Sequence, residues 1–382
     1  MTAQGIDAWI LSDFRGSNPL LWHGLGGTRS TTRRLFLILA RSGRPTVLAH
    51  PIDHARLGGL PFDIVGYRSW QEMRERLTAL VNGHRRIAVE YSPEGNVPTV
   101  SWLDAGTADL FRSWGLEIVS SADLFQVSAA AWDDRALASH LQVCPIVAAI
   151  KDAAFELIRR AHRRGTRVTD YGIQQFILHE FARHTVETEN RPIVATNANS
   201  GNPHYEPTAA GAAPIQPGDW ILIDLWARLP GEQNIFADIT WVGFAGSAVP
   251  PVMQTVFEVV TDARDRVIDT LMTAWQRGDE LQGWQLDQVA RDHIAAAGYG
   301  DAFVHQTGHS LAPGGKLHGW GVNLDNLQTH DTRTILPRTG FSIEPGIYLP
   351  AFGVRSEVNA FVDPVTGPRI TTPIQQDVIL LV

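Results

Sequence analysis

Hydrophobic residues near the middle of the chain form two runs that predict an antiparallel hairpin over residues 220–244. The runs WILIDLWA and IFADITWVGF are rich in β-branched and aromatic residues and flank a Pro-Gly-Glu-Gln-Asn turn. Each run contains one acid, Asp224 in the first and Asp238 in the second. Because a buried ionised carboxylate needs a compensating cation, a metal ion is the simplest partner for this pair. The alternative is that one Asp caps a turn and the other pairs with a distant Arg.

The hydrophobic pattern before this hairpin predicts a small α/β domain over residues 1–133. Short apolar runs alternate with helical stretches such as WQEMRERLTALV, whose apolar residues recur at helical spacing. The runs are DAWIL, RLFLILA, PTVLAH, RIAVEY and LEIVSS. No Gly-rich phosphate-binding loop is present, so this region is interpreted as a scaffold or as a domain that controls substrate access.

The remaining residues, 134–382, follow a different pattern of two helices and then strands, which occurs twice. The first helices are expected over residues 137–164, ended by Gly165, and from the Thr169-Asp170 cap to about residue 184. The second pair is expected over residues 252–277 and 284–297, before strands that continue from Phe303 to the end. This order suggests two related halves around one site.

Composition narrows the class of protein. The 382 residues are 44% hydrophobic and 19% charged, as in ordinary globular proteins, and no apolar run is long enough to span a membrane. The N-terminus is a poor signal peptide, and the single cysteine, Cys144, excludes an internal disulfide, so we expect a cytoplasmic protein. The net charge of -8 arises after Arg135, which argues against a nucleic-acid partner and would be relieved by bound divalent cations.

A second pair of acids lies downstream. Glu344 in GFSIEPGIYLP and Glu357 in GVRSEVNAFVD both interrupt apolar, strand-like segments. Candidate histidines lie between or before the acids, in segments rich in Gly, Asn and Pro: His204, His305, His309 and His318. A lone histidine is usually an ordinary surface or core residue, but several here lie among acids expected to be buried.

Four carboxylates and one imidazole form a hard, oxygen-rich set of ligands that suits two divalent ions such as Mn, Co or Zn. Carboxylates can bridge two ions roughly 3.5 to 4 Å apart, and a water held between the ions becomes hydroxide near neutral pH. This chemistry indicates a hydrolase.

With these motifs the chain resembles the pita-bread metallopeptidases, the family of aminopeptidase P, prolidase and methionine aminopeptidase, with the metal-free creatinase as a relative. The resemblance covers nearly the whole chain and is carried by Asp224, Asp238, the TGHSL segment with His309, SIEPGIY with Glu344, and Glu357 after VRS. It implies an α+β fold, in which a pita-bread catalytic domain (134–382) follows a smaller α/β, creatinase-like N-terminal domain (1–133).

The resemblance also implies a role for each site residue. Asp238 and Glu357 are expected to bridge two metal ions, most readily Mn, with Co or Zn as alternatives. Asp224, His309 and Glu344 complete the ligands. Glu344 is also the expected proton shuttle.

The other candidates are expected to act on the substrate. His204 positions it and eases protonation of the leaving group, while His305 and His318 line the pocket and stabilise the tetrahedral intermediate. Arg355, two residues before Glu357, is expected to point to the same face as that acid. There it could hold the bridging acid or bind a substrate carboxylate.

The chain departs from the family pattern at several positions. Asp224 and Asp238 are 14 positions apart, farther than usual, so a longer hairpin loop is expected. Eight residues separate His309 from His318, again more than usual, which leaves the role of His318 open. Gly319 and Val358 stand where acids are common.

The expected function is metal-dependent hydrolysis of the peptide bond before proline, with Xaa-Pro dipeptides favoured as substrates. The first alternative is an aminopeptidase P that acts on longer peptides. Alternatives of other classes are a non-catalytic peptide-binding protein and a creatinase-like hydrolase of a small amide. The resemblance further implies a homodimer, without nucleic-acid or membrane partners.

Overall fold

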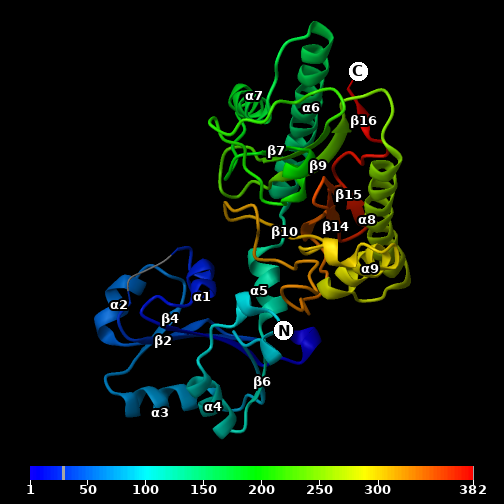
Figure 1. Cartoon of the computed structure of the whole chain (residues 1–382). Helices are drawn as coiled ribbons and strands as arrows, with labels where there is room; N and C mark the ends of the chain where they lie inside the picture. Colours follow the sequence, from blue (N-terminus) through cyan, green and yellow to red (C-terminus); the bar gives the residue numbers. More distant parts are fainter. Residues whose placement is uncertain (28–30, 382) are drawn as a thin grey trace. The chain divides into compact units, whose positions relative to one another are not determined.

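The computed structural model describes residues 1–27 and 31–381. The chain forms two compact units, Met1–Ala129 and Ala130–Val382 (Figure 1). Within the described residues, none of the helices has the length and apolarity that a membrane span requires.

The first unit contains one six-stranded sheet with the order β4-β3-β2-β1-β5-β6. β1 pairs with β2 in antiparallel and with β5 in parallel orientation. The strands are β1 Ala8–Phe14, β2 Arg34–Ala40, β3 Thr46–Ala49, β4 Asp63–Gly66, β5 Arg86–Val89 and β6 Glu117–Ser120. The helices are α1 Pro19–Gly24, α2 Pro51–Leu57, α3 Trp70–Val81, α4 Ala105–Ser113 and α5 Ala122–Ala129. The five predicted strands and the predicted helix α3 are confirmed, so this unit is a small α/β structure.

The second unit contains the four long helices expected from the sequence, and the order of two helices followed by strands occurs twice. The helices are α6 Asp134–Arg164, α7 Asp170–Arg183, α8 Pro251–Arg277 and α9 Gly283–Ala296. Asp133 caps the start of α6, and Gly165, at φ 63°, ends it in a left-handed conformation that glycine adopts without strain.

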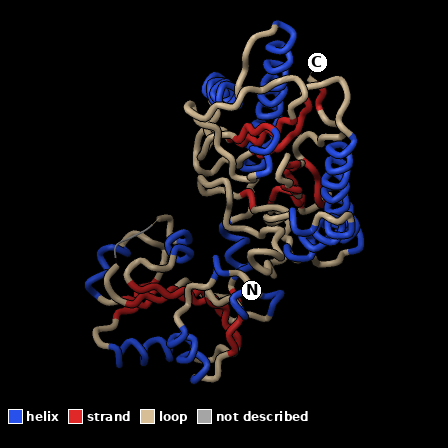
Figure 2. Tube along the Cα trace, viewed as in Figure 1, coloured by secondary structure: helices blue, strands red, loops and turns tan. Residues whose placement is uncertain are grey.

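The strands of the second unit form two four-stranded sheets, of order β16-β9-β8-β7 and β10-β11-β14-β15, and a small β12-β13 pair. Helices α6 and α7 contact the first sheet, and α8 contacts strands of the second sheet (Figure 1). Figure 2 shows strands inside this unit with the four long helices around them. The strands are β7 Ile193–Thr196, β8 Trp220–Ala227, β9 Ala237–Phe244, β10 Ser310–Leu311, β11 Gly340–Ile343, β12 Gly346–Tyr348, β13 Gly353–Arg355, β14 Val358–Asp363, β15 Gly367–Ile370 and β16 Ile379–Leu380.

The predicted hairpin is confirmed as β8 and β9, with Asp224 opposite Thr240 and Trp226 opposite Asp238. Leu225 and Ile239 on these strands belong to the hydrophobic cluster formed with α6 and α7. Because side chains alternate between the faces of a strand, Asp224 and Asp238 lie on the other face, away from those helices.

Hydrogen bonds connect the two sheets at this face of the hairpin. The backbone N–H of Asp238 donates to Oδ1 of Asn359 on β14 at 2.9 Å, and Nδ2 of Asn359 donates to the carbonyl of Asp238 at 2.8 Å. The backbone N–H of Glu357 donates to the carbonyl of Thr240 at 3.2 Å. The acids of β9 and of the segment before β14 are therefore held next to each other.

The structure corrects the local setting of the two downstream acids. Glu344 and Glu357 were expected within strands, but Glu344 lies between β11 and β12 and Glu357 lies between β13 and β14. Pro345 follows Glu344 and cannot donate to a strand ladder, so the chain leaves the sheet there. Arg355 ends β13 and Glu357 lies outside it, so the two residues do not share one strand face as expected.

Candidate metal centre

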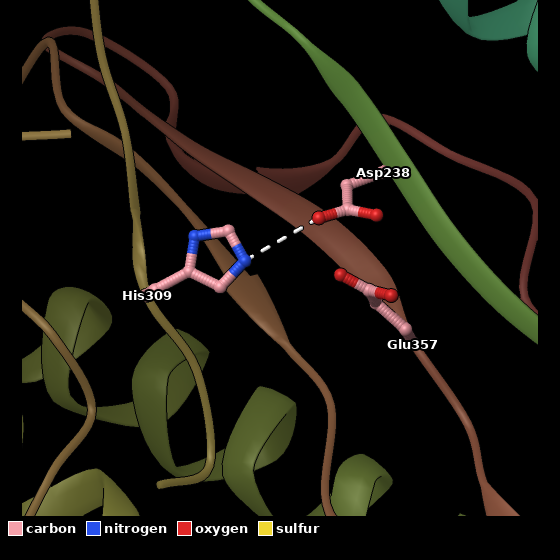
Figure 3. Close-up of side chains that lie close together, drawn as sticks. All are labelled: Asp238, His309 and Glu357. Atoms are coloured by element: carbon pink, nitrogen blue, oxygen red, sulfur yellow. Dashed lines mark ion pairs between the residues drawn. The ribbon is translucent and has the colours of Figure 1, made fainter. Parts of the chain in front are cut away.

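Three buried side chains from distant parts of the sequence meet at one point of the second unit. Asp238, His309 and Glu357 each offer a ligand atom, and these atoms lie within 4.8 Å of one another (Figure 3). Nε2 of His309 is 3.3 Å from Oδ2 of Asp238. Asp238 comes from β9, His309 immediately precedes β10, and Glu357 immediately precedes β14.

The two remaining predicted ligands border this cluster. Oε1 of Glu344 is 3.4 Å from Nε2 of His309 and accepts a hydrogen bond from Oγ of Ser342 at 2.9 Å. The Asp224 carboxylate interacts electrostatically with both Asp238 and Glu344. The structure thus brings all five predicted ligands into one neighbourhood.

Carboxylate oxygens at the cluster fit a bound cation. In the described part of the chain, Oδ1 of Asp224, Oδ1 of Asp238 and Oε1 of Glu357 are buried and have no hydrogen-bond partner. A buried polar atom without a partner is costly, and most such atoms in proteins are satisfied. Three acidic oxygens beside an imidazole form a set of ligands suited to divalent ions.

Burial and mutual repulsion disfavour the charged forms of three of these acids. Burial, opposed by Arg355 and reinforced by the nearby acids Asp238 and Glu344, raises the pKa of Asp224 to about 7. Burial and the neighbouring carboxylates also raise the pKa values of Asp238 and Glu357. For Glu344, the raising effect of burial is outweighed by His309 and Arg355, so its pKa lies below the usual value. A bound cation would favour the ionised forms of all four.

Arg355 is buried and engaged by the protein rather than free. Its Nη2 contacts Asp224, its Nε donates to Oγ1 of Thr240 at 3.0 Å, and its Nη1 donates to the hydroxyl of Tyr348 at 3.0 Å. Oγ1 of Thr240 in turn donates to Oε2 of Glu357 at 2.9 Å. Arg355 was expected to hold the bridging acid Glu357 or to bind a substrate carboxylate. In the structure it contacts Asp224 directly and reaches Glu357 only through Thr240.

The histidines occupy different places around the cluster. The ring of His318 stacks on His309 with centroids 4.0 Å apart, and positive charge on His309 lowers the pKa of His318 to about 3. His305 hydrogen-bonds through Nε2 to the Tyr348 hydroxyl at 2.7 Å, and burial lowers its pKa to about 4. His204 is exposed on a loop, and it lies close enough to His318 to contribute to the lowering of the His318 pKa.

Three residues that shape this site were not predicted from the sequence: Thr240, Tyr348 and Asn359. Each acts through a contact with a residue far away in the chain, which no local pattern reveals. Tyr348 lies in the SIEPGIY segment, so its proximity to Glu344 in the sequence was the one available signal.

Comparison with known proteins identifies related sequences. The model of metallopeptidase family M24 matches residues 140–364. The Xaa-Pro dipeptidase of Lactobacillus helveticus is 31% identical over 186 residues, which are 48% of this chain and 43% of that protein. The Xaa-Pro dipeptidase of Pyrococcus furiosus is 30% identical over 180 residues, 47% of this chain and 46% of that protein. The matched region therefore spans less than half of each of these relatives.

Solved structures resemble the chain over almost its whole length. The dipeptidase PepE of Mycobacterium ulcerans aligns with a TM-score of 0.63 at 19% identity, covering 100% of this chain and 94% of that one. The X-Pro aminopeptidase of Thermotoga maritima aligns with a TM-score of 0.57 at 21% identity, covering 98% of both chains. At such identities the likeness shows a common fold, and it confirms the predicted α+β, pita-bread class.

Proposed function

Because the chain belongs to metallopeptidase family M24, whose model matches more than half of its length, we propose that it hydrolyses the peptide bond before proline. Xaa-Pro dipeptides are the substrates that we favour. The main support for the proposal is that buried carboxylate oxygens without hydrogen-bond partners lie close together beside His309. The relatives named Xaa-Pro dipeptidase support the choice of substrate.

Five residues would hold two divalent ions: Asp224, Asp238, His309, Glu344 and Glu357. Asp238 and Glu357 are the proposed bridging ligands, and Mn is the proposed metal, with Co and Zn as alternatives. Divalent ions at such a site polarise a carbonyl and lower the pKa of bound water.

The residues of the chain would then handle protons and orientation. Glu344, whose lowered pKa keeps it ionised, accepts a proton from the attacking water and passes it to the leaving proline nitrogen. His318 has a lowered pKa, so it acts as a neutral hydrogen-bond donor to the developing oxyanion. In neutral His305 the Nδ1–H donates to the carbonyl of Gln306 and Nε2 accepts from the Tyr348 hydroxyl, so His305 lines the pocket and supports the oxyanion through Tyr348. His204 on its exposed loop meets the substrate near the leaving group.

Arg355 and His318 are the proposed contacts for the substrate itself. The guanidinium of Arg355 is already committed to Asp224, Thr240 and Tyr348. We therefore propose that Arg355 acts mainly by fixing Asp224, and that a substrate carboxylate would reach it only by sharing these contacts.

A comparison of substrates tests the proposal. The purified protein, loaded with Mn or Co, is assayed with Ala-Pro, Ala-Pro-Ala and Ala-Ala. We expect cleavage of Ala-Pro, slower cleavage of Ala-Pro-Ala and none of Ala-Ala.

Faster cleavage of Ala-Pro-Ala would instead identify an aminopeptidase P. Absence of any Xaa-Pro cleavage by metal-loaded protein would contradict the proposal and favour a peptide-binding protein. Hydrolysis of a creatine-like substrate without metal would favour a creatinase-like enzyme.

The proposal includes a cytoplasmic location and a homodimer that contacts neither nucleic acid nor membrane. The single cysteine and the acidic net charge of -8 support the location and the exclusion of nucleic acid. The family resemblance alone supports the homodimer, and light scattering of the purified protein measures it directly.

A further inference from the structure

The two loops that are longer than the family pattern touch each other beside His318. One loop, residues 228–236, connects β8 to β9, and the other, residues 313–318, carries His318. The backbone N–H of Gly314 donates to the carbonyl of Glu232 at 2.8 Å. A Cβ added to Gly315 would lie 3.4 Å from Cγ of Glu232 and 3.6 Å from Nη1 of Arg228. The two loops are therefore joined by a backbone hydrogen bond, and Gly315 lies close to Glu232 and Arg228.

A third segment, residues 187–189, binds both loops. Oε1 of Glu187 accepts from Nε of Arg228 at 2.9 Å and from the backbone N–H of Gly231 at 3.3 Å. The backbones of Glu187 and Arg228 also exchange hydrogen bonds, both of 2.9 Å. Oε2 of Glu189 accepts from the backbone N–H of Leu317 at 2.8 Å. Glu189 thus binds the residue immediately before His318.

The loop is packed as well as hydrogen-bonded. Leu317 is buried in the same hydrophobic cluster as Trp226 and Phe236 of the hairpin. Arg228, which is 8% exposed, lies with its guanidinium 5.0 Å from the centroid of the Phe236 ring. The loop that carries His318 therefore packs against the hairpin.

A second anchor follows His318 directly. The backbone N–H of Gly319 donates to the carbonyl of Ser310 at 2.8 Å, and that of Gly321 donates to Oγ of Ser310 at 2.9 Å. Ser310 is the neighbour of His309, on which His318 stacks. His318 is thus fastened on one side through Leu317 to Glu189 and on the other through Gly319 to Ser310.

We propose that Glu189 is a positioning residue that fastens the loop 313–318 onto the hairpin loop and so holds His318 against His309. Gly314 and Gly315 have φ values of 123° and 86°, which glycine adopts without strain. Because glycines have many accessible backbone conformations, this stretch gains conformational freedom when its contacts are lost. The catalytic consequence rests on the proposed function, in which His318 contacts the substrate. The placement of the loop does not depend on it.

The test uses Glu189→Ala, the conservative Glu189→Gln and a control, Glu206→Ala. Glu206 is another exposed acid in the same unit, with an ion pair to Arg191 at 3.7 Å. In Glu189→Ala we expect the Leu317 amide to exchange hydrogen faster, and kcat on Ala-Pro to fall about ten-fold with a similar KM. Glu189→Gln retains an accepting oxygen and should stay close to wild type in both measurements.

Hydrogen exchange separates this proposal from the proposed function. If wild-type protein cleaves no Xaa-Pro peptide, the function fails, and exchange at Leu317 still decides the role of Glu189. The positioning role is overturned if Glu189→Ala matches Glu206→Ala in exchange, or if exchange rises while kcat is unchanged in an active enzyme. Equal loss in Glu189→Gln and Glu189→Ala would also overturn it, since a lost hydrogen bond would not be the cause.

Discussion

The residue after His318 is a glycine because the chain there passes directly over Ala312. A Cβ on Gly319 would lie 2.5 Å from Cβ of Ala312 and 2.9 Å from its backbone N. The acid common in the family at this position therefore has no room in this chain. Val358, the other position where an acid is common, is fully buried in the hydrophobic core. Both departures match the packing of the residues around them.

Gly319→Ala should destabilise the protein through this overlap. We expect the free energy of unfolding to fall by about 1 to 3 kcal/mol, as overpacked sites usually show. Gly24→Ala is the control, because a Cβ at Gly24 meets nothing within 4 Å. Urea denaturation measures both variants. A Gly319→Ala protein as stable as Gly24→Ala would show that the close approach to Ala312 is absent.

His204→Ala should lower turnover on the order of 100-fold while leaving the metal content intact. The reason is that His204 is exposed on its loop and lies outside the cluster of ligand atoms formed by Asp238, His309 and Glu357. Steady-state kinetics with metal analysis of the same preparation measures both quantities. Loss of metal in this variant would make His204 a ligand and contradict the assignment.

At this scale the four acids are predictable because each interrupts an apolar segment, and His309 because it lies in a glycine-rich segment between the two pairs of acids and in the TGHSL motif. It could not find Thr240 or Asn359, whose hydrogen bonds join residues more than 100 positions apart, such as the bond of Thr240 with Glu357 or of Asn359 with Asp238. Such contacts depend on how the two sheets pack against each other. The local pattern of hydrophobic and polar residues does not specify this packing.

At the scale of elements, predictions worked where the burial pattern was strong. Hairpin β8–β9 and helices α6 to α9 have continuous apolar faces, and all were predicted. Strand β4 was missed because it lies at the sheet edge and its residues are exposed or half-buried. The breaks at Glu344 and Glu357 were missed because their backbone N–H groups bond outside the local ladder, Glu344 to the carbonyl of Thr307 at 2.7 Å.

Helix α9 contributes a buried carboxylate that fixes the segment leading to His309. Oδ1 of Asp287 accepts from the backbone N–H of Thr307 at 2.8 Å and from its hydroxyl at 2.6 Å. Arg291, paired with Asp287, lies 4.3 Å from the centroid of the Phe303 ring and donates to the carbonyl of His305. The helix therefore places both His305 and His309.

In the first unit, Glu90 directly follows strand β5 and should make stability depend on pH. Burial raises its pKa to about 7, even though Trp9, at 2.9 Å, and Ser121, at 3.3 Å, donate hydrogen bonds to it. A carboxyl group whose pKa is raised on folding stabilises fully at low pH, and this contribution is lost as pH rises from about 4.5 through about 7. The loss should be on the order of 3 kcal/mol.

Glu90→Gln cannot ionise, so thermal unfolding of this variant should vary less between pH 5 and pH 8 than that of wild type. The quantity compared is the slope of unfolding temperature against pH. A loss of packing or hydrogen bonding in the variant that is the same at every pH does not change this slope. Parallel curves for the two proteins would show that Glu90 does not titrate in this range.

At the scale of the whole molecule, the sequence predicted two regions and a second unit with a repeated order of elements. The structure has compact units Met1–Ala129 and Ala130–Val382, and the order of two helices followed by strands occurs twice in the second. The packing of the two sheets, which brings Asp238 of β9 beside Glu357, could not be predicted from the pattern of hydrophobic and polar residues. It was expected only through the family resemblance.

Asp238 of β9 and Glu357, which precedes β14, are proposed to hold divalent ions together, and a metal titration tests this directly. Wild type, Asp238→Ala and Glu357→Ala are stripped with a chelator and titrated with Mn in a calorimeter, with circular dichroism to verify folding. We predict two ions bound per wild-type chain, and loss of metal binding together with turnover in both variants. A folded wild-type protein that binds no divalent ion, or variants that bind as much Mn as wild type, would contradict the account.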